Sequence, residues 1–175
     1  LEVGCGKGGF AVGMAAAYPE RCFIAMEKIS DVLLLAAERA VREADSRPDN
    51  LRFISGDARD LAAWFSEGSL DGIYLNFSDP WPKARYAKRR LTHRGFLEKY
   101  KKLLKDGARI FFKTDNRPLF DFSLEEVEKS PFTLEYHTFD LHNSEMDATN
   151  IRTEYERNFS AKGFSINMLI AKNNK

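Results

Sequence analysis

Short apolar runs alternate with amphipathic stretches along most of this chain, and that alternation restricts the possible folds more than any other feature. The apolar runs predict strands that end at Val3 and that cover 22–26, 51–55, 70–77 and 108–113. Apolar residues at helical spacing predict helices at 9–18, 29–44, 61–65, 92–104 and 118–129. Strands that alternate with helices pair in parallel, and the helices cover both faces of the sheet. The sequence therefore predicts an α/β fold.

The two ends of the chain differ from this pattern. Toward the C-terminus, 132–141 and 164–172 predict two strands separated by polar residues. At the other end the chain begins inside its first strand, directly before a glycine-rich turn, with neither a signal peptide nor a charged presequence. No internal repeat or low-complexity linker interrupts it. We therefore expect one domain over 1–175, truncated at its N-terminus.

The composition excludes several classes of protein. With 43% hydrophobic residues, the 175-residue chain is too apolar to be disordered, and it contains no run of about 18 apolar residues that predicts a membrane span. Cys5 and Cys22 lie far apart, so we expect two small core residues of a cytoplasmic protein. The spacing of His93, His137 and His142 does not suit a metal site, and we expect no metal.

The segment 4–9 is a glycine-rich turn between a strand and a helix. Glycines there adopt positive φ and allow a ligand to approach the backbone, because no Cβ intervenes. Gly4, Gly6 and Gly9 match the G-x-G-x-x-G pattern of dinucleotide-binding proteins. The methyltransferase pattern E-x-G-x-G-x-G is matched as well, by Glu2, Gly4, Gly6 and Gly8. The turn alone leaves both ligands open.

Two acidic residues accompany the turn. Glu27 ends the second strand about 20 residues further on, where a carboxylate can bind the hydroxyls of an adenosine ribose. Its alternative is a solvated pair with Lys28. Glu2 lies in a strand expected to be buried, where a carboxylate needs a partner. The cationic methionine group of S-adenosylmethionine provides one, whereas a pyrophosphate is repelled, so Glu2 favours the methyl donor over a dinucleotide.

Asp57 and Ala58 directly follow the third strand. Asp57 is placed to accept a hydrogen bond from the exocyclic amine of adenine, and the Ala58 N–H to donate one to the ring. Asp57 also suits an ordinary helix N-cap before Leu61. The two roles are compatible.

The loop after the fourth strand is the most informative part of the chain, and it reads Asn76-Phe77-Ser78-Asp79-Pro80-Trp81-Pro82-Lys83. Ligands of open parallel sheets bind beyond the carboxyl ends of the strands, so we expect Asp79 where substrate meets donor. Pro80 and Pro82 stiffen the loop, and Trp81 offers a flat face to the fold or to a base.

A basic segment follows at once, although the net charge is only +1. Its cations are Lys83, Arg85, Lys88, Arg89, Arg90 and Arg94. Most charge runs are solvated surfaces, but the position of this one beside the expected active site favours phosphate binding. The next helix is expected to have Thr92 as its N-cap.

Together these motifs resemble those of the bacterial tRNA (guanine-N7-)-methyltransferases, which are class I S-adenosylmethionine-dependent methyltransferases. The resemblance rests on Glu2 to Gly8, Asn76 to Lys83 and Lys88-Arg89-Arg90, and it extends to Thr114-Asp115-Asn116 and Thr153-Glu154-Tyr155-Glu156. It implies a Rossmann-like methyltransferase fold with a mostly parallel seven-stranded sheet, an antiparallel last strand and helices on both faces.

The resemblance also implies an activity, namely methyl transfer from S-adenosylmethionine to N7 of a guanosine in the tRNA variable loop, with Asp79 as the catalytic residue. The implied donor-binding residues are Glu2, Gly4, Gly6, Gly8, Glu27, Asp57, Ala58, Asn76 and Asp79. The implied guanosine contacts are Lys83, Asp115, Thr153, Glu154, Tyr155 and Glu156. The implied contacts to the tRNA backbone are Arg85, Tyr86, Lys88, Arg89 and Arg90.

Tyr86 departs from the family pattern, which commonly has His at this position. The change lowers activity if that His does more than contact phosphate or sugar. We expect tRNA as the partner, no membrane association, and a monomer or homodimer.

Two other functions stay open on the residues alone. A small-molecule methyltransferase of the same fold explains Glu2, Glu27 and the glycine turn, but not the basic segment. A non-catalytic RNA-binding subunit explains the basic segment, but it has no need of the polar residues Asp79, Asp115 and Glu156.

Overall fold

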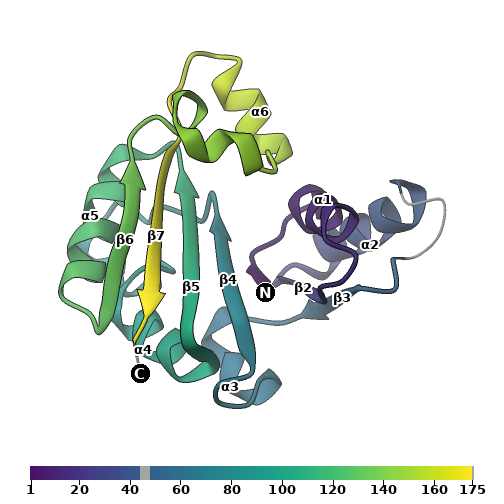
Figure 1. Ribbon diagram of the computed structural model, residues 1–175, viewed down its shortest axis with the longest axis horizontal. Coiled ribbons are helices and arrows are strands. Elements are labelled where there is room, and N and C mark those ends of the chain that lie inside the picture. The colour runs from purple at the N-terminus through teal and green to yellow at the C-terminus, as the bar shows by residue number, and fades with distance from the viewer. Residues whose placement is uncertain (44–47, 175) are drawn as a thin grey trace.

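Seven strands form one sheet in the computed structural model, which describes residues 1–43 and 48–174 (Figure 1). Their order across the sheet is β3-β2-β1-β4-β5-β7-β6. The strands are β1 (Glu2–Val3), β2 (Phe23–Glu27), β3 (Leu51–Ser55), β4 (Leu70–Asn76), β5 (Leu104–Thr114), β6 (Phe132–Thr138) and β7 (Asn167–Asn173). The first five strands run parallel, whereas β7 is antiparallel to β5 and β6. The predicted mostly parallel sheet with an antiparallel last strand is confirmed.

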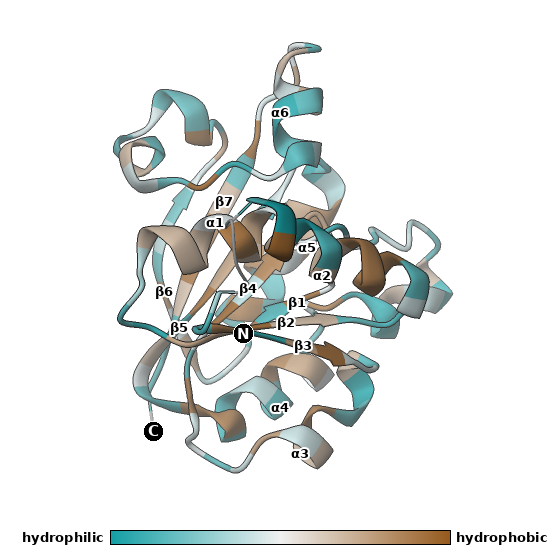
Figure 2. Ribbon diagram, turned by 90° about the vertical axis from the view of Figure 1, so that its right-hand side faces the viewer, coloured by the Kyte–Doolittle hydropathy of each residue, from teal (hydrophilic) through white to brown (hydrophobic). Residues whose placement is uncertain are grey.

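Helices cover both faces of this sheet, as the alternation predicts. Within the described ranges the α-helices are α1 (Gly9–Ala17), α2 (Ser30–Glu43), α3 (Leu61–Trp64), α4 (Arg94–Leu103), α5 (Arg117–Glu128) and α6 (Glu154–Ser160). Helix α1 packs on α2, and α4 contacts both α3 and α5. Figure 2 shows α1 and α2 above the edge-on strands β1–β3, with α3 and α4 below them. None of the helices described is long and apolar enough to cross a membrane.

The central strands are buried on both faces, which is usual for parallel sheets. Leu75 of β4 and Phe112 of β5 are completely buried. Polar side chains on these strands are therefore exceptions that need an explanation. Glu2, Asn76 and Lys113 are such exceptions, since each is at most 8% exposed, and all three lie at or near the carboxyl ends of their strands.

The expected N-cap of α4 is wrong by one residue. His93 Nδ1 accepts a hydrogen bond from the Gly95 N–H at 3.0 Å, and the helix begins at Arg94. Thr92 is instead buried, and its hydroxyl lies 2.7 Å from the Ser123 hydroxyl of α5. A buried hydroxyl needs such a partner, so Thr92 ties the start of α4 to α5.

The C-terminal third contains more helix than the sequence analysis predicts. Strand β6 ends at Thr138, and two 3-10 helices (Leu141–Asn143 and Glu145–Thr149) and α6 precede β7. The predicted helix at 29–44 ends at Glu43 within the described residues, and its last residue lies outside them. Cys5 is buried but Cys22 is exposed, so the prediction of two core cysteines is wrong for Cys22.

Candidate active site

The glycine-rich turn joins β1 to α1. Gly4, Gly6 and Gly8 have φ of 78°, 54° and 75°, which residues with a Cβ rarely adopt. A Cβ at Gly8 would lie 2.7 Å from the Cβ of Ala36 in α2, so the packing of α2 against the turn requires glycine there. A Cβ at Gly4 or Gly6 would meet no atom within 4 Å. The space beside these two glycines is open to a ligand.

Glu27, at the end of β2, is oriented by backbone donors. Its Oε2 accepts the Gly6 N–H at 3.1 Å, and its Oε1 accepts the Lys28 and Ile29 N–H groups at 2.8 and 3.1 Å. The alternative pair with Lys28 does not form, because Lys28 Nζ lies 3.1 Å from Asp57 Oδ2. A carboxylate has about four acceptor positions, so one remains for a ligand hydroxyl.

Glu2 and Asn76 form a buried polar pair at the ends of β1 and β4. Asn76 Nδ2 donates to Glu2 Oε1 at 2.9 Å. Glu2 Oε2 and Asn76 Oδ1 are buried with no hydrogen-bond partner in the described part of the chain. Burial raises the pKa of Glu2 to about 7, although Asn76 and the charge of Lys113 act to lower it. A buried carboxylate with one unused oxygen is suited to a cationic ligand.

Asp57 caps the 3-10 helix Ala58–Asp60 by accepting the Arg59 N–H at 2.9 Å. The Arg59 side chain also donates to both carboxylate oxygens, at 3.0 and 2.9 Å. These hydrogen bonds, with Lys28, hold the pKa of Asp57 well below its usual range. The cap role is confirmed, and binding of an adenine amine by Asp57 requires Arg59 or Lys28, both exposed, to move.

The loop after β4 is strained. Phe77 and Trp81 have φ of 52° and 43°, conformations that cost about 1–3 kcal/mol each and gather at functional sites. Asp79 is exposed between them. Its carboxylate forms no hydrogen bond or ion pair with a residue of the described ranges, and it is therefore available to a ligand.

Two cavities adjoin in this region, and Gly4 and Phe77 line both. The larger, of about 850 Å³, has a lining that includes Glu27, Asp57, Ala58 and Asp79. The smaller, of about 360 Å³, has a lining that includes Glu2, Asn76, Thr153, Glu154 and Tyr155. One ligand that extends across Gly4 can therefore reach Glu2 and Glu27 together.

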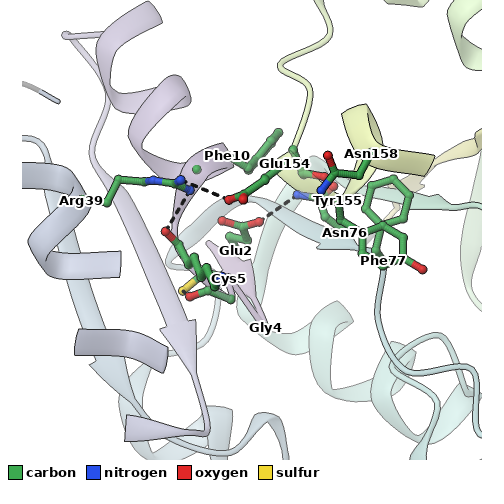
Figure 3. Close-up of a pocket in the computed structure, with 14 residues that line it drawn as sticks. Glu2, Gly4, Cys5, Phe10, Arg39, Asn76, Phe77, Glu154, Tyr155 and Asn158 are labelled. Carbon is green, nitrogen blue, oxygen red and sulfur yellow. Dashed lines mark hydrogen bonds and ion pairs between the residues drawn. The ribbon is translucent and has the colours of Figure 1, made fainter. Parts of the chain in front are cut away.

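Arg39 of α2, which the sequence analysis does not single out, closes one side of the smaller cavity. Figure 3 shows its guanidinium between the turn and α6. Its Nη2 pairs with Glu154 Oε2 at 3.1 Å, and its Nη1 donates to the Lys7 carbonyl at 3.3 Å. Glu154 is 115 residues away in the sequence, so local spacing carries no signal for this contact.

The basic segment forms a 3-10 helix, Ala84–Arg89, at the mouth of the larger cavity. Four of its exposed cations form no ion pair with any acidic residue of the described ranges, and they are Lys83, Arg85, Lys88 and Arg89. The exposed Arg94 instead pairs with Glu126 Oε1 of α5 at 2.7 Å. Tyr86 is half-buried, with the guanidinium groups of Arg85 and Arg89 at 4.9 and 4.6 Å from its ring centroid. Tyr86 thus serves as an aromatic support for two cations.

The residues expected at the guanosine lie in three different places. Thr153, Glu154 and Tyr155 line the smaller cavity, and the Tyr155 hydroxyl lies 3.5 Å from Asp115 Oδ2. Lys83 lies in the exposed basic segment. Glu156 is completely buried and lines neither cavity.

Glu156 is instead the centre of a buried network. Its Oε2 pairs with Lys113 Nζ of β5 at 2.7 Å, and its Oε1 lies 2.8 Å from His142 Nε2 and 2.7 Å from Asn150 Nδ2. The Thr153 hydroxyl and the Glu156 carboxylate also complete a capping box at the start of α6. With both oxygens bound inside the protein, Glu156 holds α6 on the sheet and has no side open to guanosine, contrary to the expected contact.

The cavity lining is compatible with S-adenosylmethionine. The unpartnered Glu2 Oε2 matches a cationic methionine group, and the open space at Gly4 and Gly6 admits a ligand against the backbone. The described residues contain no group of three or more His, Cys, Asp or Glu that could hold a metal ion.

Comparisons of sequence agree with this arrangement. A family model described as "Putative methyltransferase" matches residues 1–169. A tRNA (guanine-N(7)-)-methyltransferase of Listeria monocytogenes is 49% identical over 172 residues, which are 98% of this chain and 78% of that protein. The protein of the same name from Macrococcus caseolyticus is 48% identical over 98% of this chain and 80% of its own length.

Comparisons of structure support the fold. The 16S rRNA methyltransferase KamB superimposes with a TM-score of 0.73 at 13% identity, over 99% of this chain and 86% of that chain. A SAM-dependent O-methyltransferase of Thermotoga maritima superimposes with a TM-score of 0.65 at 15% identity, over 99% and 58%. With the sequence matches over nearly its whole length, the chain belongs to the tRNA (guanine-N(7)-)-methyltransferase family.

Proposed function

We propose that residues 1–175 form one methyltransferase domain that transfers a methyl group from S-adenosylmethionine to N7 of a guanosine in the tRNA variable loop. One observation carries this proposal: Glu2, Glu27 and Asp79 line adjoining cavities, and the unpaired cations Lys88 and Arg89 of the basic segment line the larger one. A small-molecule methyltransferase needs only the cavities, and a non-catalytic RNA-binding subunit needs only the basic segment. Family membership agrees with the combination of both.

Donor binding uses residues at the carboxyl ends of β1, β2 and β4. Bound S-adenosylmethionine supplies an electrophilic methyl group on its sulfonium. The free Oε2 of Glu2 opposes the positive charge of the methionine group, and Glu27, fixed by three N–H groups, accepts a ribose hydroxyl. Asp57 takes the adenine amine once Arg59 turns outward.

The reaction needs alignment more than proton transfer. Guanine N7 has a free lone pair and no proton, so no general base has to generate the nucleophile. As the N–C bond forms and the C–S electron pair returns to sulfur, positive charge passes to the purine. Asp79, which has no partner within the described ranges, and Asp115, beside the Tyr155 hydroxyl, hold the guanine edge and oppose that charge.

The tRNA contacts are expected from the exposed side of the basic segment. Lys83, Arg85, Lys88 and Arg89 bind backbone phosphates, while the target base leaves its stack to reach Asp79. We also propose that the protein acts in the cytoplasm as a monomer or homodimer.

The test is methyl transfer from labelled S-adenosylmethionine to an unmodified tRNA transcript, followed by digestion to nucleosides. We expect the label in 7-methylguanosine. Asp79→Asn should lower the turnover number by about 100-fold or more, as removal of one oriented electrostatic group does, with much less change in donor affinity.

The matched control is Asp71→Asn. Asp71 is 82% exposed and lies near the opposite end of β4, where it pairs with Lys105, so its removal should leave turnover as in the wild type. Label in another nucleoside contradicts the proposed target atom. Full activity of the Asp79 variant contradicts the catalytic role.

A further inference from the structure

Arg90 differs from the unpaired cations of the basic segment, because its side chain is bonded within the protein. Its Nε donates to the Pro80 carbonyl at 3.0 Å, and its Nη2 donates to the Trp81 carbonyl at 3.1 Å. Its guanidinium lies 4.3 Å from the centroid of the Phe122 ring of α5. Arg90 is half-buried, whereas Arg85, Lys88 and Arg89 are exposed.

The backbone of the loop that carries Asp79 has few other attachments, although the centroid of the Trp81 ring lies 4.8 Å from the Arg89 guanidinium and 5.9 Å from that of the Tyr86 ring. In the part of the chain that the structure describes, residues 78–82 form no backbone–backbone hydrogen bond, and Pro80 and Pro82 have no N–H to donate. The nearest such bonds are the Phe77 N–H to the Lys113 carbonyl and the Tyr86 N–H to the Lys83 carbonyl, each at 2.9 Å. The two hydrogen bonds from Arg90 therefore fasten the middle of this loop.

The attachment acts where the loop is strained. Trp81 has a positive φ of 43°, and its carbonyl accepts one of the two hydrogen bonds. Asp79 lies directly before Pro80, whose carbonyl accepts the other. A strained conformation persists only where its surroundings determine it. Arg90 holds the loop in this conformation, because its planar guanidinium group bonds the Pro80 and Trp81 carbonyls and lies over the Phe122 ring.

We infer that Arg90 is a positioning residue for Asp79 and makes no phosphate contact, although its neighbours in the basic segment do. The expected effect of Arg90 on kcat rests on the proposed function, whereas its effect on the loop rests on the contacts of Arg90 alone. A lysine keeps the charge but cannot reproduce the planar fork and the stacking. Arg90→Lys therefore separates the two roles.

The first experiment measures the kinetics of Arg90→Lys and Arg90→Gln, with Lys88→Gln for comparison. Both Arg90 variants should lower kcat by about 10- to 100-fold, and the logarithmic dependence of tRNA affinity on salt should keep the wild-type slope. Lys88→Gln should reduce that slope by about 1. Wild-type kcat in Arg90→Lys, or a slope reduced by both Arg90→Gln and Lys88→Gln, overturns the inference.

The second experiment needs neither donor nor tRNA, so it does not depend on the proposed function. The chain has two tryptophans, and Trp64→Phe leaves Trp81 as the only one. In that background, Arg90→Lys and Phe122→Leu should shift the Trp81 emission to longer wavelength and increase its quenching by acrylamide, at temperatures where circular dichroism shows native helix. Lys88→Gln should change neither. The inference is overturned if the Trp81 emission is unchanged in both Arg90→Lys and Phe122→Leu.

Discussion

Asn76 Nδ2 donates to Glu2 Oε1 at 2.9 Å, and this hydrogen bond leaves Glu2 Oε2 and Asn76 Oδ1 buried without partners among the described residues. The pair joins the ends of two adjacent strands, β1 and β4. Burying polar atoms without hydrogen bonds lowers stability. The protein therefore keeps an unfavourable polar site at the place where the donor is proposed to bind, as expected where function and stability compete.

Glu2→Gln should stabilise the protein in a pH-dependent way. Burial raises the pKa of Glu2 from 4.5 to about 7, so between these values the native state retains a proton that the unfolded chain releases. Wild-type stability is thereby lowered as pH rises from 4.5 to 7. At pH 8 the variant, which cannot ionise, should have a free energy of unfolding higher by up to about 3 kcal/mol. Urea denaturation at pH 8 and pH 5 measures the difference.

That gain should fall to about 1 kcal/mol or less at pH 5, where Glu2 is protonated in the native state but largely ionised in the unfolded chain. The control is Glu20→Gln, because Glu20 is exposed and pairs with the equally exposed Arg21 beside it. It should change stability little at either pH. Equal gains for Glu2→Gln at both pH values would contradict the assigned pKa.

Donor affinity should depend on pH through the same carboxylate. Only ionised Glu2 opposes a cation, so below pH 7 binding of S-adenosylmethionine requires the release of a proton. The dissociation constant should therefore rise by about five- to tenfold from pH 7.5 to pH 6. Isothermal titration calorimetry measures it. Glu2→Gln should bind more weakly, without this dependence on pH, and an identical dependence in variant and wild type would assign it to another group.

The sequence could predict those parts of the site that depend on spacing along the chain. Glu2 and Glu27 lie in strands, and the glycine turn and the Asp79 loop each follow one. Parallel strands bring their carboxyl ends to one edge of the sheet. The observed order of strands places Glu2 beside Asn76, although 74 residues separate them. The sequence does not predict this pair, since it gives no order for the strands.

Contacts made by single side chains across the fold could not be predicted in this way. Lys113 is the last residue of a predicted apolar strand, and a lysine in a buried strand implies an acidic partner. Its partner, Glu156, is 43 residues away. The spacing of Thr153 and Glu156 is the signature of a capping box, so the sequence contains a signal for α6 besides the substrate contact that the family resemblance implies. The inward orientation of Arg90 has no signal within a run of cations.

The Lys113–Glu156 pair should be important for stability. Burial acts to raise the pKa of Glu156, but the charge and hydrogen bond of Lys113, with the hydrogen bonds of Asn150 and His142, together hold that pKa below its usual range. Lys113→Met leaves a buried carboxylate without its cation and should lower the free energy of unfolding by about 3–5 kcal/mol. Lys113→Met combined with Glu156→Gln should recover part of this loss. Urea denaturation of the single and double variants gives the coupling.

Lys105→Met is the matched control for this pair. Lys105 belongs to the same strand and pairs with Asp71 at 2.7 Å, but both side chains are at least half exposed. An exposed pair contributes about 0–1 kcal/mol, so this variant should lose little stability. Similar losses for Lys113→Met and Lys105→Met would show that burial does not strengthen the inner pair.

Gly4→Ala and Gly8→Ala should separate donor binding from packing. Both glycines have positive φ, 78° and 75°, so alanine costs about 1–2 kcal/mol of conformational strain at each. At Gly8 the new Cβ also meets the Cβ of Ala36 at 2.7 Å and its Cα at 3.1 Å, whereas at Gly4 it meets nothing within 4 Å. Gly8→Ala should therefore show the larger decrease in melting temperature.

Donor affinity should change in the opposite order. Gly4 lines both cavities, and a methyl group there occupies space through which the proposed donor extends along the backbone. Gly4→Ala should raise the dissociation constant of S-adenosylmethionine at least about tenfold, which corresponds to about 1.4 kcal/mol. Gly8→Ala, measured well below its melting temperature, should raise it less. If Gly4→Ala binds the donor as tightly as the wild type, the donor does not extend across Gly4, and the two cavities do not share one ligand.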